Sequence, residues 1–418
     1  RNAEEIVKEY NRYNQLRDNK SFEAMYSNAG KYIQFIFKYG PILRKSKELS
    51  IYKIREKLFD LIGTLRCISL SKNDGADKRL QEAGKALSGY YQDTRYEDFL
   101  KFIKNRKLRL NYAQNKKKNL VIVMGHKNPD TDTTTCSIFE AWRNSLINKK
   151  TDYVPIIQGD SIPEEARRLL GDEIADAIPL HSMKSYDLAK KSGLVRWISV
   201  DQNREPEVQK YFISIIDHHV VSEMAKNLDI PKTLELTGSC AALIAMKMLG
   251  MGMKFDDRIS KIFYGTTLMD TENRVGHKMT VKDEYLMNHL KHSSKTKSDN
   301  ELYRDLMSYL LSTDNAEILF RRDYKEDWGF GFAVTKIKGG FDNKGKVLKK
   351  GLINRSLDLA RKNNISKNLP LTLLRITDYE EDNETVNMER VYMLFNRASS
   401  EFKTSIISLL ESIIKFEF

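Results

Sequence analysis

The chain has 418 residues, of which 41% are hydrophobic and 10% aromatic. This length predicts two or three domains with ample apolar cores. No run of about 18 apolar residues is present, so no membrane span is expected. Three widely separated cysteines, Cys67, Cys136 and Cys240, favour a reducing compartment, either the cytoplasm or the mitochondrial matrix. Because the sequence starts at Arg1, a targeting peptide would not be visible.

The positive charge of the chain is concentrated in its first part. Residues 1–118 hold 27 Lys and Arg against 14 Asp and Glu, whereas the rest of the chain holds 43 of each. The whole net charge of +13 therefore belongs to this region. A basic region beside a neutral body favours an anionic partner such as nucleic acid, another polyanion or a membrane surface. A solvated helical surface is the alternative, and both stay open.

Residues 1–118 predict an all-helical basic extension. Apolar residues recur there at helical spacing, and Gly40-Pro41 predicts a break after the second helix. Dense positive charge at 101–109 and 115–118 marks the expected join to the next domain. The expected helices are Ala3–Leu16, Phe22–Tyr39, Tyr52–Leu70, Lys78–Tyr91 and Tyr96–Lys107.

From Asn119 onward, short strands alternate with helices. This alternation predicts an α/β domain over residues 119–293, with a doubly wound and mainly parallel sheet. The expected strands are Leu120–Met124, Tyr153–Ile157, Val195–Val200 and Tyr211–Ile216, and the helices between them include Thr134–Leu146 and Pro163–Leu170.

The stretch VIVMGHKNPDTD, from Val121 to Asp132, carries the first candidate site residues. Its apolar half is short and β-branched, which is typical of a strand buried on both faces of a parallel sheet. His126, Asp130 and Asp132 follow at the carboxyl end of that strand. An imidazole with two carboxylates suits Mn²⁺, Mg²⁺ or Zn²⁺. A turn whose aspartates cap the following helix is the alternative.

Two more predicted strands end in similar residues. Val195–Val200 runs into Asp201, and Tyr211–Ile216 runs into Asp217, His218 and His219. The carboxyl ends of parallel strands meet at one edge of a sheet, where open α/β sheets bind their ligands. We therefore expect convergence of His126, Asp130, Asp132, Asp201, His218 and His219.

Two later segments add to this edge. The string LTGSC at 236–240 opens an apolar helix, Ala241–Leu249. Its Gly-Ser turn offers N–H groups to an anion, with an ordinary helix cap as the alternative. A further helix, Ile259–Met269, delivers Asp270.

Residues 299–418 predict a smaller α+β domain, with the polar stretch His292–Asn300 as a linker. Basic residues Arg321, Arg322, Lys325, Lys338, Arg397 and Lys403 are candidates for contact with a phosphate-bearing substrate, although solvated surface charge explains most such residues. The expected elements are helices Leu302–Leu311, Leu352–Lys362 and Glu401–Phe416 and strands Gly331–Ile337, Leu371–Ile376 and Arg390–Phe395.

Over residues 119–337 the sequence resembles the DHH superfamily of phosphoesterases, named for the triplet found here at 217–219. The strings GHKNPDTD, VDQN, IIDHH and LMDT are similar, in order and spacing, to four motifs of family II inorganic pyrophosphatases. TGSCAALIA, the pattern at 270–283 and RRDYKEDW at 321–328 resemble the exopolyphosphatase and prune branch. The second domain of both groups is of the DHHA2 type, and the resemblance implies that type here.

The resemblance implies a site with two divalent metal ions, Mn²⁺ or Mg²⁺. His126 and Asp130 would bind one ion, Asp132, His218 and Asp270 the other, and Asp201 would bridge both. His219 would contact the substrate phosphate, Asp217 would orient the histidines, and Lys325, Arg322 and Arg397 would bind substrate. Asp201 and His219 are the expected catalytic residues.

Two departures from the family pattern bear on the substrate. The second motif usually reads Asp-His-Asn, whereas its middle residue here is Gln202. The Ser-Arg-Lys phosphate clamp expected near the C-terminus is not evident, and the nearest string is SEFK at 400–403, with Arg397 before it. The residues that bind substrate are therefore less well defined than those expected to bind metal.

The resemblance implies an exopolyphosphatase or inorganic pyrophosphatase that releases orthophosphate by a two-metal mechanism. Two other hypotheses stay open. One is a nuclease of the same superfamily acting on short RNA. The other is a recruited subunit or assembly factor of a large ribonucleoprotein complex, such as the mitochondrial ribosome, with RNA or ribonucleoprotein contact through residues 1–118.

Overall fold

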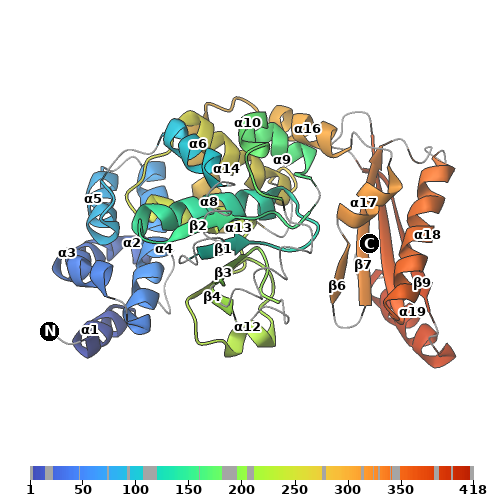
Figure 1. The fold of residues 1–418 in the computed structure, drawn as a ribbon, viewed down its shortest axis with the longest axis horizontal. Coiled ribbons are helices and arrows are strands. Elements are labelled where there is room, and N and C mark those ends of the chain that lie inside the picture. The colour runs from blue at the N-terminus through green and yellow to red at the C-terminus, as the bar shows by residue number, and fades with distance from the viewer. Residues whose placement is uncertain are drawn as a thin grey trace. The chain divides into compact units, whose positions relative to one another are not determined.

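The computed structural model divides into two compact units, Arg1–Tyr303 and Arg304–Phe418 (Figure 1). The structure describes residues 3–14, 22–46, 48–72, 75–91, 95–106, 120–159, 161–180, 195–204, 211–274, 279–311, 315–322, 324–327, 330–338, 340, 349–380, 386–396 and 399–414.

The first unit is built around a five-stranded sheet with strand order β2-β1-β3-β4-β5, in which every neighbouring pair is parallel. The predicted α/β fold with a parallel sheet is therefore confirmed. The sequence did not predict β5, which has three residues. The strands are β1 (Leu120–Met124), β2 (Asp152–Pro155), β3 (Val195–Val200), β4 (Phe212–Asp217) and β5 (Lys232–Leu234).

Both faces of this sheet are covered. This agrees with the sequence of its strands, which are apolar without alternation. Leu120, Ile122 and Met124 of β1 pack on one face with Trp197 of β3 and Ala225 of the short helix α12 (Glu223–Asn227). The helices α8 (Thr131–Ile147) and α13 (Cys240–Gly250) contact the strands and lie together on the other side of the sheet in Figure 1.

The helices before β1 belong to the same compact unit as the sheet. The longest of them, α4, is buried over most of its length and packs against α13. The predicted domain boundary at residue 118 stays a prediction. These helices are α1 (Ala3–Asn14), α2 (Phe22–Ser27), α3 (Ala29–Lys45), α4 (Leu49–Lys72), α5 (Asp77–Ser88) and α6 (Tyr96–Lys104).

The expected break at Gly40-Pro41 is wrong, because α3 continues through Pro41 to Lys45. The expected helix Phe22–Tyr39 instead divides near Asn28, between α2 and α3. Proline has no N–H to donate to the carbonyl four residues earlier. Here that carbonyl belongs to Phe37, and both Phe37 and Pro41 are exposed, so the missing hydrogen bond lies on the solvent side of α3.

The remaining helices of the first unit surround α8 and α13. The expected linker His292–Asn300 is mostly helical: α15 ends at Ser294 and α16 begins at Asp299. Lys295 ends α15 in the left-handed region, with φ 57°. The helices are α9 (Glu164–Leu170), α10 (Asp172–Ala175), α14 (Asp257–Asp270), α15 (Val281–Ser294) and α16 (Asp299–Leu310), the last of which crosses the unit boundary.

The second unit has a four-stranded mixed sheet with order β6-β7-β8-β9, in which only β7 and β8 are parallel. Phe320, Ile337, Ile353 and Leu374 are part of its core. The predicted smaller α+β fold is confirmed. Its elements are α17 (Ala316–Arg322), β6 (Lys325–Asp327), β7 (Phe330–Lys338), α18 (Lys350–Ser366), β8 (Leu371–Tyr379), β9 (Val386–Phe395) and α19 (Ser400–Ile414).

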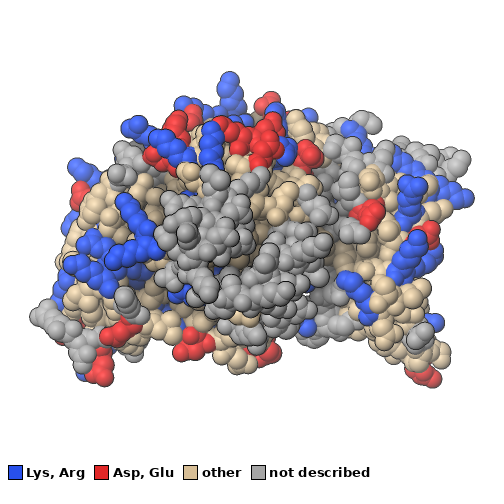
Figure 2. All heavy atoms as spheres, viewed as in Figure 1, with Lys and Arg blue, Asp and Glu red and all other residues tan. Residues whose placement is uncertain are grey.

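The surface of the first unit shows the charge asymmetry of the sequence. In Figure 2, Lys and Arg gather over the region of α3, α4 and α5, whereas acidic and basic groups alternate over α6, α9 and α10. Within the described ranges, no helix combines the length and apolar character needed to cross a membrane.

Candidate metal centre

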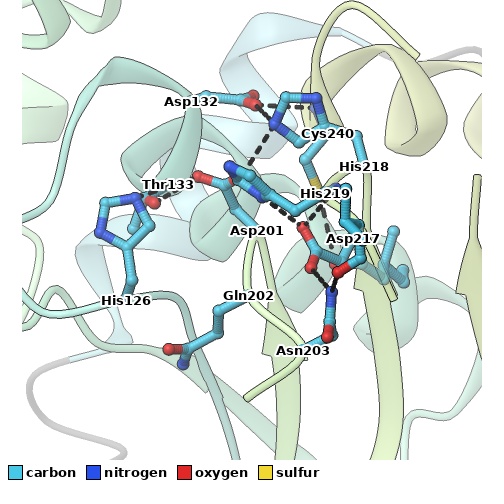
Figure 3. A network of polar contacts seen from close by, with 12 residues as sticks. His126, Asp132, Thr133, Asp201, Gln202, Asn203, Asp217, His218, His219 and Cys240 are labelled. Atoms are coloured by element: carbon cyan, nitrogen blue, oxygen red, sulfur yellow. Dashed lines mark hydrogen bonds and ion pairs between the residues drawn. The ribbon is translucent and has the colours of Figure 1, made fainter. Parts of the chain in front are cut away.

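The carboxyl ends of β1, β3 and β4 bring His126, Asp201 and His218 together (Figure 3). The last residue of α14, Asp270, joins this cluster. In each of three groups, one ligand atom per residue lies within 4.8 Å of the others: His126, Asp130 and Asp201; Asp132, His218 and Asp270; and Asp201, His218 and His219.

The loop after β1 positions His126 and Asp130. Asp130 is the N-cap of α8, and its Oδ1 accepts a hydrogen bond from the Thr133 N–H at 2.8 Å. His126 Nδ1 lies 2.9 Å from the Lys127 carbonyl oxygen. Since only an N–H can bond a carbonyl, this contact assigns the proton to Nδ1. The other ring nitrogen, Nε2, lies 3.4 Å from Asp130 Oδ2 and 3.3 Å from Asp201 Oδ2.

Asp201 lies at the centre of the site, immediately after β3. It adopts a left-handed backbone conformation, with φ 53°. Its N–H donates to the Ile216 carbonyl of β4 at 2.9 Å, which helps to hold this strained turn. Thr133 Oγ1 donates to Asp201 Oδ2. Oδ1 is buried and accepts no hydrogen bond from the part of the chain that is described, although it lies 3.3 Å from His218 Nε2.

His218 has one ring nitrogen fixed by the backbone and the other directed at carboxylates. Nδ1 donates to the Thr237 carbonyl oxygen at 3.0 Å. Nε2 lies 3.3 Å from Asp201 Oδ1, 3.5 Å from Asp270 Oδ2 and 3.7 Å from Asp132 Oδ2. In the neutral imidazole with its proton on Nδ1, the lone pair of Nε2 faces three carboxylate oxygens, which carry lone pairs of their own. A cation between them would turn this repulsion into attraction.

Asp132 explains the Gly-Ser turn at 238–239. Its carboxylate accepts hydrogen bonds from the Cys240 and Ala241 N–H groups, at 2.7 and 2.8 Å, and from Ser239 Oγ at 2.9 Å. The anion at the start of α13 is therefore a side chain of the same protein. Ser239 is also the N-cap of α13, since its Oγ accepts from the Ala241 N–H. The turn therefore binds an anion, the Asp132 carboxylate, and also caps the helix.

Asp270 ends α14 and is followed by a strained turn. Glu272, Asn273 and Arg274 have φ of 50°, 61° and 63°, a conformation that non-glycine residues rarely adopt in succession. Side chains hold the turn: Asn273 Nδ2 donates to Asn300 Oδ1 at 3.0 Å, and Arg274 donates to Asn288 Oδ1 at 2.7 Å. Strain held in this way is characteristic of functional sites.

His219 differs from the other two histidines in its exposure. Its side chain is 42% exposed, against 14% for His126 and 8% for His218. Its Nδ1 lies 2.8 Å from Oδ1 of the fully buried Asp217. Asp217 Oδ1 also accepts from the His219 N–H at 3.2 Å. That Asp217 orients the histidines, as the resemblance implies, stays a prediction.

Gln202, which replaces the expected histidine, takes part in a backbone contact. Its Nε2 donates to the Gly125 carbonyl at 2.9 Å, and Gln158 Nε2 donates to the same oxygen. Two amide groups thus fix the end of β1 directly before His126. The substitution places a neutral donor beside the site.

The charges of the site shift the pKa values of its members strongly. Burial lowers the pKa of His218, but the adjacent carboxylate of Asp201 and the charges of Asp270 and Asp132 outweigh burial and raise the pKa to about 11. Burial and the negative charges of Asp201 and Asp270 raise the pKa of Asp132. These shifts show that the cluster attracts positive charge.

The donor set fits divalent cations such as Mn²⁺ or Mg²⁺. Imidazole nitrogens and carboxylate oxygens are the ligands that such ions take, and the structure directs them at one another without intervening cationic side chains among the residues that it describes. His218 Nε2 can bind one ion only. The group of Asp201, His218 and His219 shares this nitrogen with the group of Asp132, His218 and Asp270. It is therefore an alternative to that group and not an additional site.

The second unit carries the residues that were predicted to contact the substrate phosphate. Arg322 ends α17 and Lys325 begins β6, but their side chains lie outside the described part of the structure, as does the whole of Arg397. The sequence assigned no role to Thr133 or Asn203, which hydrogen-bond Asp201 and Asp217. Thr133 directly follows a metal-capable residue, and Asn203 is the last residue of the VDQN string.

Fold and site together define a class: an α/β protein with a cluster of histidines and aspartates that could hold metal ions at the carboxyl edge of a parallel sheet. No family model matches the chain. Among curated proteins, an Archaeoglobus fulgidus protein assigned as a manganese-dependent inorganic pyrophosphatase is 26% identical over 165 residues, which are 37% of this chain and 49% of its own length. A manganese-dependent inorganic pyrophosphatase of Methanothrix thermoacetophila is 27% identical over 151 residues, 36% of this chain and 47% of its own length.

One of two solved structures supports the fold. A Methanococcus jannaschii protein assigned to the family II inorganic pyrophosphatases aligns with a TM-score of 0.51 and 18% identity over 66% of this chain and 87% of its own. An exopolyphosphatase-related protein from Bacteroides fragilis gives a TM-score of 0.34 and 15% identity, too low to support a conclusion. The predicted resemblance to the manganese-dependent, family II pyrophosphatases is thus confirmed, although the chain spans about half the length of the curated relatives.

Proposed function

We propose that this protein is a metal-dependent phosphoanhydride hydrolase that releases orthophosphate from pyrophosphate or inorganic polyphosphate. The observation that carries the proposal is the convergence of His126 Nε2 and His218 Nε2 on the two oxygens of Asp201, each at 3.3 Å. Acidic groups then complete each side. The resemblance to manganese-dependent pyrophosphatases supplies the reaction type.

In this proposal the chain holds two cations through two sets of side chains. His126, Asp130 and Asp201 bind the first, and Asp132, His218, Asp270 and Asp201 bind the second. When bound, two divalent ions neutralise the phosphoryl charge and lower the pKa of water enough for attack at neutral pH.

The remaining residues orient these groups and receive the substrate. Thr133 holds the shared carboxylate of Asp201, and the Thr237 carbonyl fixes the tautomer of His218. His219 is the exposed imidazole that contacts the phosphoryl oxygens. Its Nδ1 is bonded to Asp217, so in the protonated ring its Nε2 donates to these oxygens and stabilises the charge that develops on them. The contacts of Arg322, Lys325 and Arg397 with the leaving phosphate stay a prediction.

The test is orthophosphate release from pyrophosphate and from polyphosphate, with Mn²⁺ or Mg²⁺ added to metal-depleted protein. We expect metal-dependent release that disappears in Asp201→Ala, because both cations lose a ligand. Asp229→Ala, which removes a carboxylate that is 84% exposed, is the matched control and should retain activity. Turnover by Asp201→Ala at the rate of the unmodified protein would refute the proposal.

Two other hypotheses are tested by separate experiments. No observation favours a nuclease or a ribonucleoprotein subunit over the hydrolase. Incubation with labelled short RNA in parallel distinguishes the first. Sedimentation of the protein from lysate, alone or with a large particle, distinguishes the second.

A further inference from the structure

Asn203 lies two residues after Asp201 and is buried, with 5% of its surface exposed. Both functional groups of its side chain are used. Nδ2 donates to Asp217 Oδ2 and, at 3.0 Å, to the Val220 carbonyl, while Oδ1 accepts from the Ser222 N–H at 2.8 Å. Figure 3 shows the amide of Asn203 directed at Asp217, away from the metal-capable carboxylates.

The carboxylate of Asp217 connects Asn203 with His219. While Oδ2 of Asp217 accepts from Asn203, Oδ1 accepts from His219 Nδ1 at 2.8 Å and from the His219 N–H at 3.2 Å. Both carboxylate oxygens of a side chain with no exposed surface are thereby fixed. The orientation of the His219 ring depends on this carboxylate, and the orientation of the carboxylate depends on the Asn203 amide.

We infer that Asn203 is a positioning residue for His219. It touches neither the metal-capable atoms of the site nor the exposed side of the ring. It acts through Asp217 to hold the imidazole of His219 in one orientation toward the substrate phosphate. This inference rests on the proposed function, in which His219 contacts that phosphate, and it gives a role to Asn203, the last residue of the VDQN string, for which the motif resemblance implied none.

A purely structural role is the competing explanation, because Asn203 also fastens the loop after β4. Ser222 separates the two roles. Its Oγ donates to the Asn203 carbonyl at 2.7 Å and accepts from the Ala225 N–H at 3.1 Å, so it holds the same loop without touching Asp217. Ser222→Ala therefore loosens the loop and leaves the contact between Asn203 and Asp217 in place.

The informative variant is Asn203→Asp, which keeps the size and the oxygen that accepts from Ser222. It replaces the donor to Asp217 with a second carboxylate oxygen, and like charges in contact repel. We expect kcat/KM for pyrophosphate to fall about tenfold to a hundredfold, the usual effect of losing an orienting partner. The Mn²⁺ affinity, measured by calorimetry, should change by less than about twofold, and Ser222→Ala should retain most of the activity.

A double-mutant cycle tests the route through His219. If Asn203 acts through that ring, Asn203→Asp should have almost no further effect in a His219→Ala background. Full additivity of the two effects, or a loss of Mn²⁺ affinity in Asn203→Asp that matches the loss of activity, would overturn the inference.

One further measurement separates this inference from the proposed function. The ¹⁵N shifts of the His219 ring, assigned by comparison with His219→Ala, report which nitrogen carries the proton whether or not the protein hydrolyses pyrophosphate. We expect a proton on Nδ1 in the unmodified protein and a changed Nδ1 shift in Asn203→Asp but not in Ser222→Ala. An unchanged shift refutes the inference, whereas absent hydrolysis refutes the proposed function.

Discussion

Asp201 directs each of its carboxylate oxygens at a different histidine, Oδ2 at His126 and Oδ1 at His218. Such an arrangement leaves little freedom for the side chain, and Thr133 limits it further through a hydrogen bond to Oδ2. Thr133 also donates its N–H to Asp130. One residue therefore positions two of the three members of the His126 group.

Replacing Thr133 by valine removes this hydroxyl and preserves the shape of the side chain. We expect Mn²⁺ affinity to fall about tenfold to a hundredfold, because Asp201 loses the donor that orients it. Calorimetric titration with Mn²⁺ measures the change.

The neighbouring Thr134 offers a matched control. It is fully buried, and its hydroxyl has no hydrogen-bond partner among the described residues. Thr134→Val should leave the affinity unchanged and stability equal or higher, since burial of an unpaired hydroxyl is unfavourable. Equal affinities in Thr133→Val and the unmodified protein would contradict the assigned role of Thr133.

The sequence predicted the metal-capable residues because parallel strands place their carboxyl ends at one edge. It did not predict the groups that orient them. Thr133 and Asp201 are 68 positions apart, and nothing in a string of letters shows which hydroxyl meets which carboxylate. The geometry of such contacts depends on the register of β1 and β3, which only the folded structure shows.

At the scale of elements, the contact between α4 and α13 is unusually close. A Cβ atom added to Gly63 would lie 1.9 Å from the Met246 carbonyl oxygen, and one added to Gly250 would lie 1.7 Å from that of Phe59. Two helices can approach to this distance only where side chains are absent. The sequence predicted both helices but not their pairing, because helical spacing shows which face is apolar and not which partner covers it.

A buried group of charges connects the same two helices with α8. Glu56 of α4 accepts hydrogen bonds from Arg143 at 3.0 Å and from Lys247 at 3.2 Å, and Arg143 also pairs with Glu140. Burial raises the pKa of Glu56, but the charges of Arg143 and Lys247 outweigh burial and lower it to about 2.

This shift predicts a pH dependence of stability. Because the folded pKa of Glu56 lies below its usual value, the ion pair stabilises the protein above about pH 4.5, and this contribution is lost as the pH falls toward 2. Its size is on the order of 3 kcal/mol. Removing one partner of a buried pair leaves the others uncompensated, so Glu56→Gln should lower the free energy of unfolding at pH 7 by about 3–5 kcal/mol.

Urea unfolding at several pH values measures this difference. We expect the difference in the free energy of unfolding between Glu56→Gln and the unmodified protein to become smaller as the pH falls from 5 to 2. Glu82→Gln on the exposed side of α5 is the control and should unfold like the unmodified protein. A difference that stays constant with pH would show that Glu56 does not carry this charge-dependent stability.

At the scale of the whole molecule, the helices before β1 are part of the unit that holds the metal centre. Arg66 of α4 donates to the Leu249 and Met253 carbonyls, each at 2.7 Å. Gln81 and Ser88 of α5 donate to the Gly252 and Met251 carbonyls, each at 3.0 Å. The charge of residues 1–118 suggested an independent extension, but composition does not reveal that one side of these helices completes a core.

We therefore expect a chain that begins at Lys107 to lose its cooperative fold. Without α4 and α5, the outer side of α13 and the carbonyls at its end would be exposed without partners. Soluble yield, near-UV circular dichroism and thermal unfolding measure the effect. A chain that ends at Tyr303 is the control, since it retains every one of these contacts. A soluble, cooperatively unfolding protein that starts at Lys107 would contradict this expectation.

The pairing of Lys247 of α13 with Glu56 of α4 bears on how these two helices evolved together. Lys247 sits in the middle of α13 with 1% of its surface exposed, and its ammonium group is bonded to Glu56. Deleting the gene segment for α4 would leave that ammonium group without its carboxylate in an apolar helix, whereas adding α4 to an ancestor without the lysine would leave Glu56 paired with Arg143 alone. Loss of α4 is therefore expected to require a compensating change at Lys247.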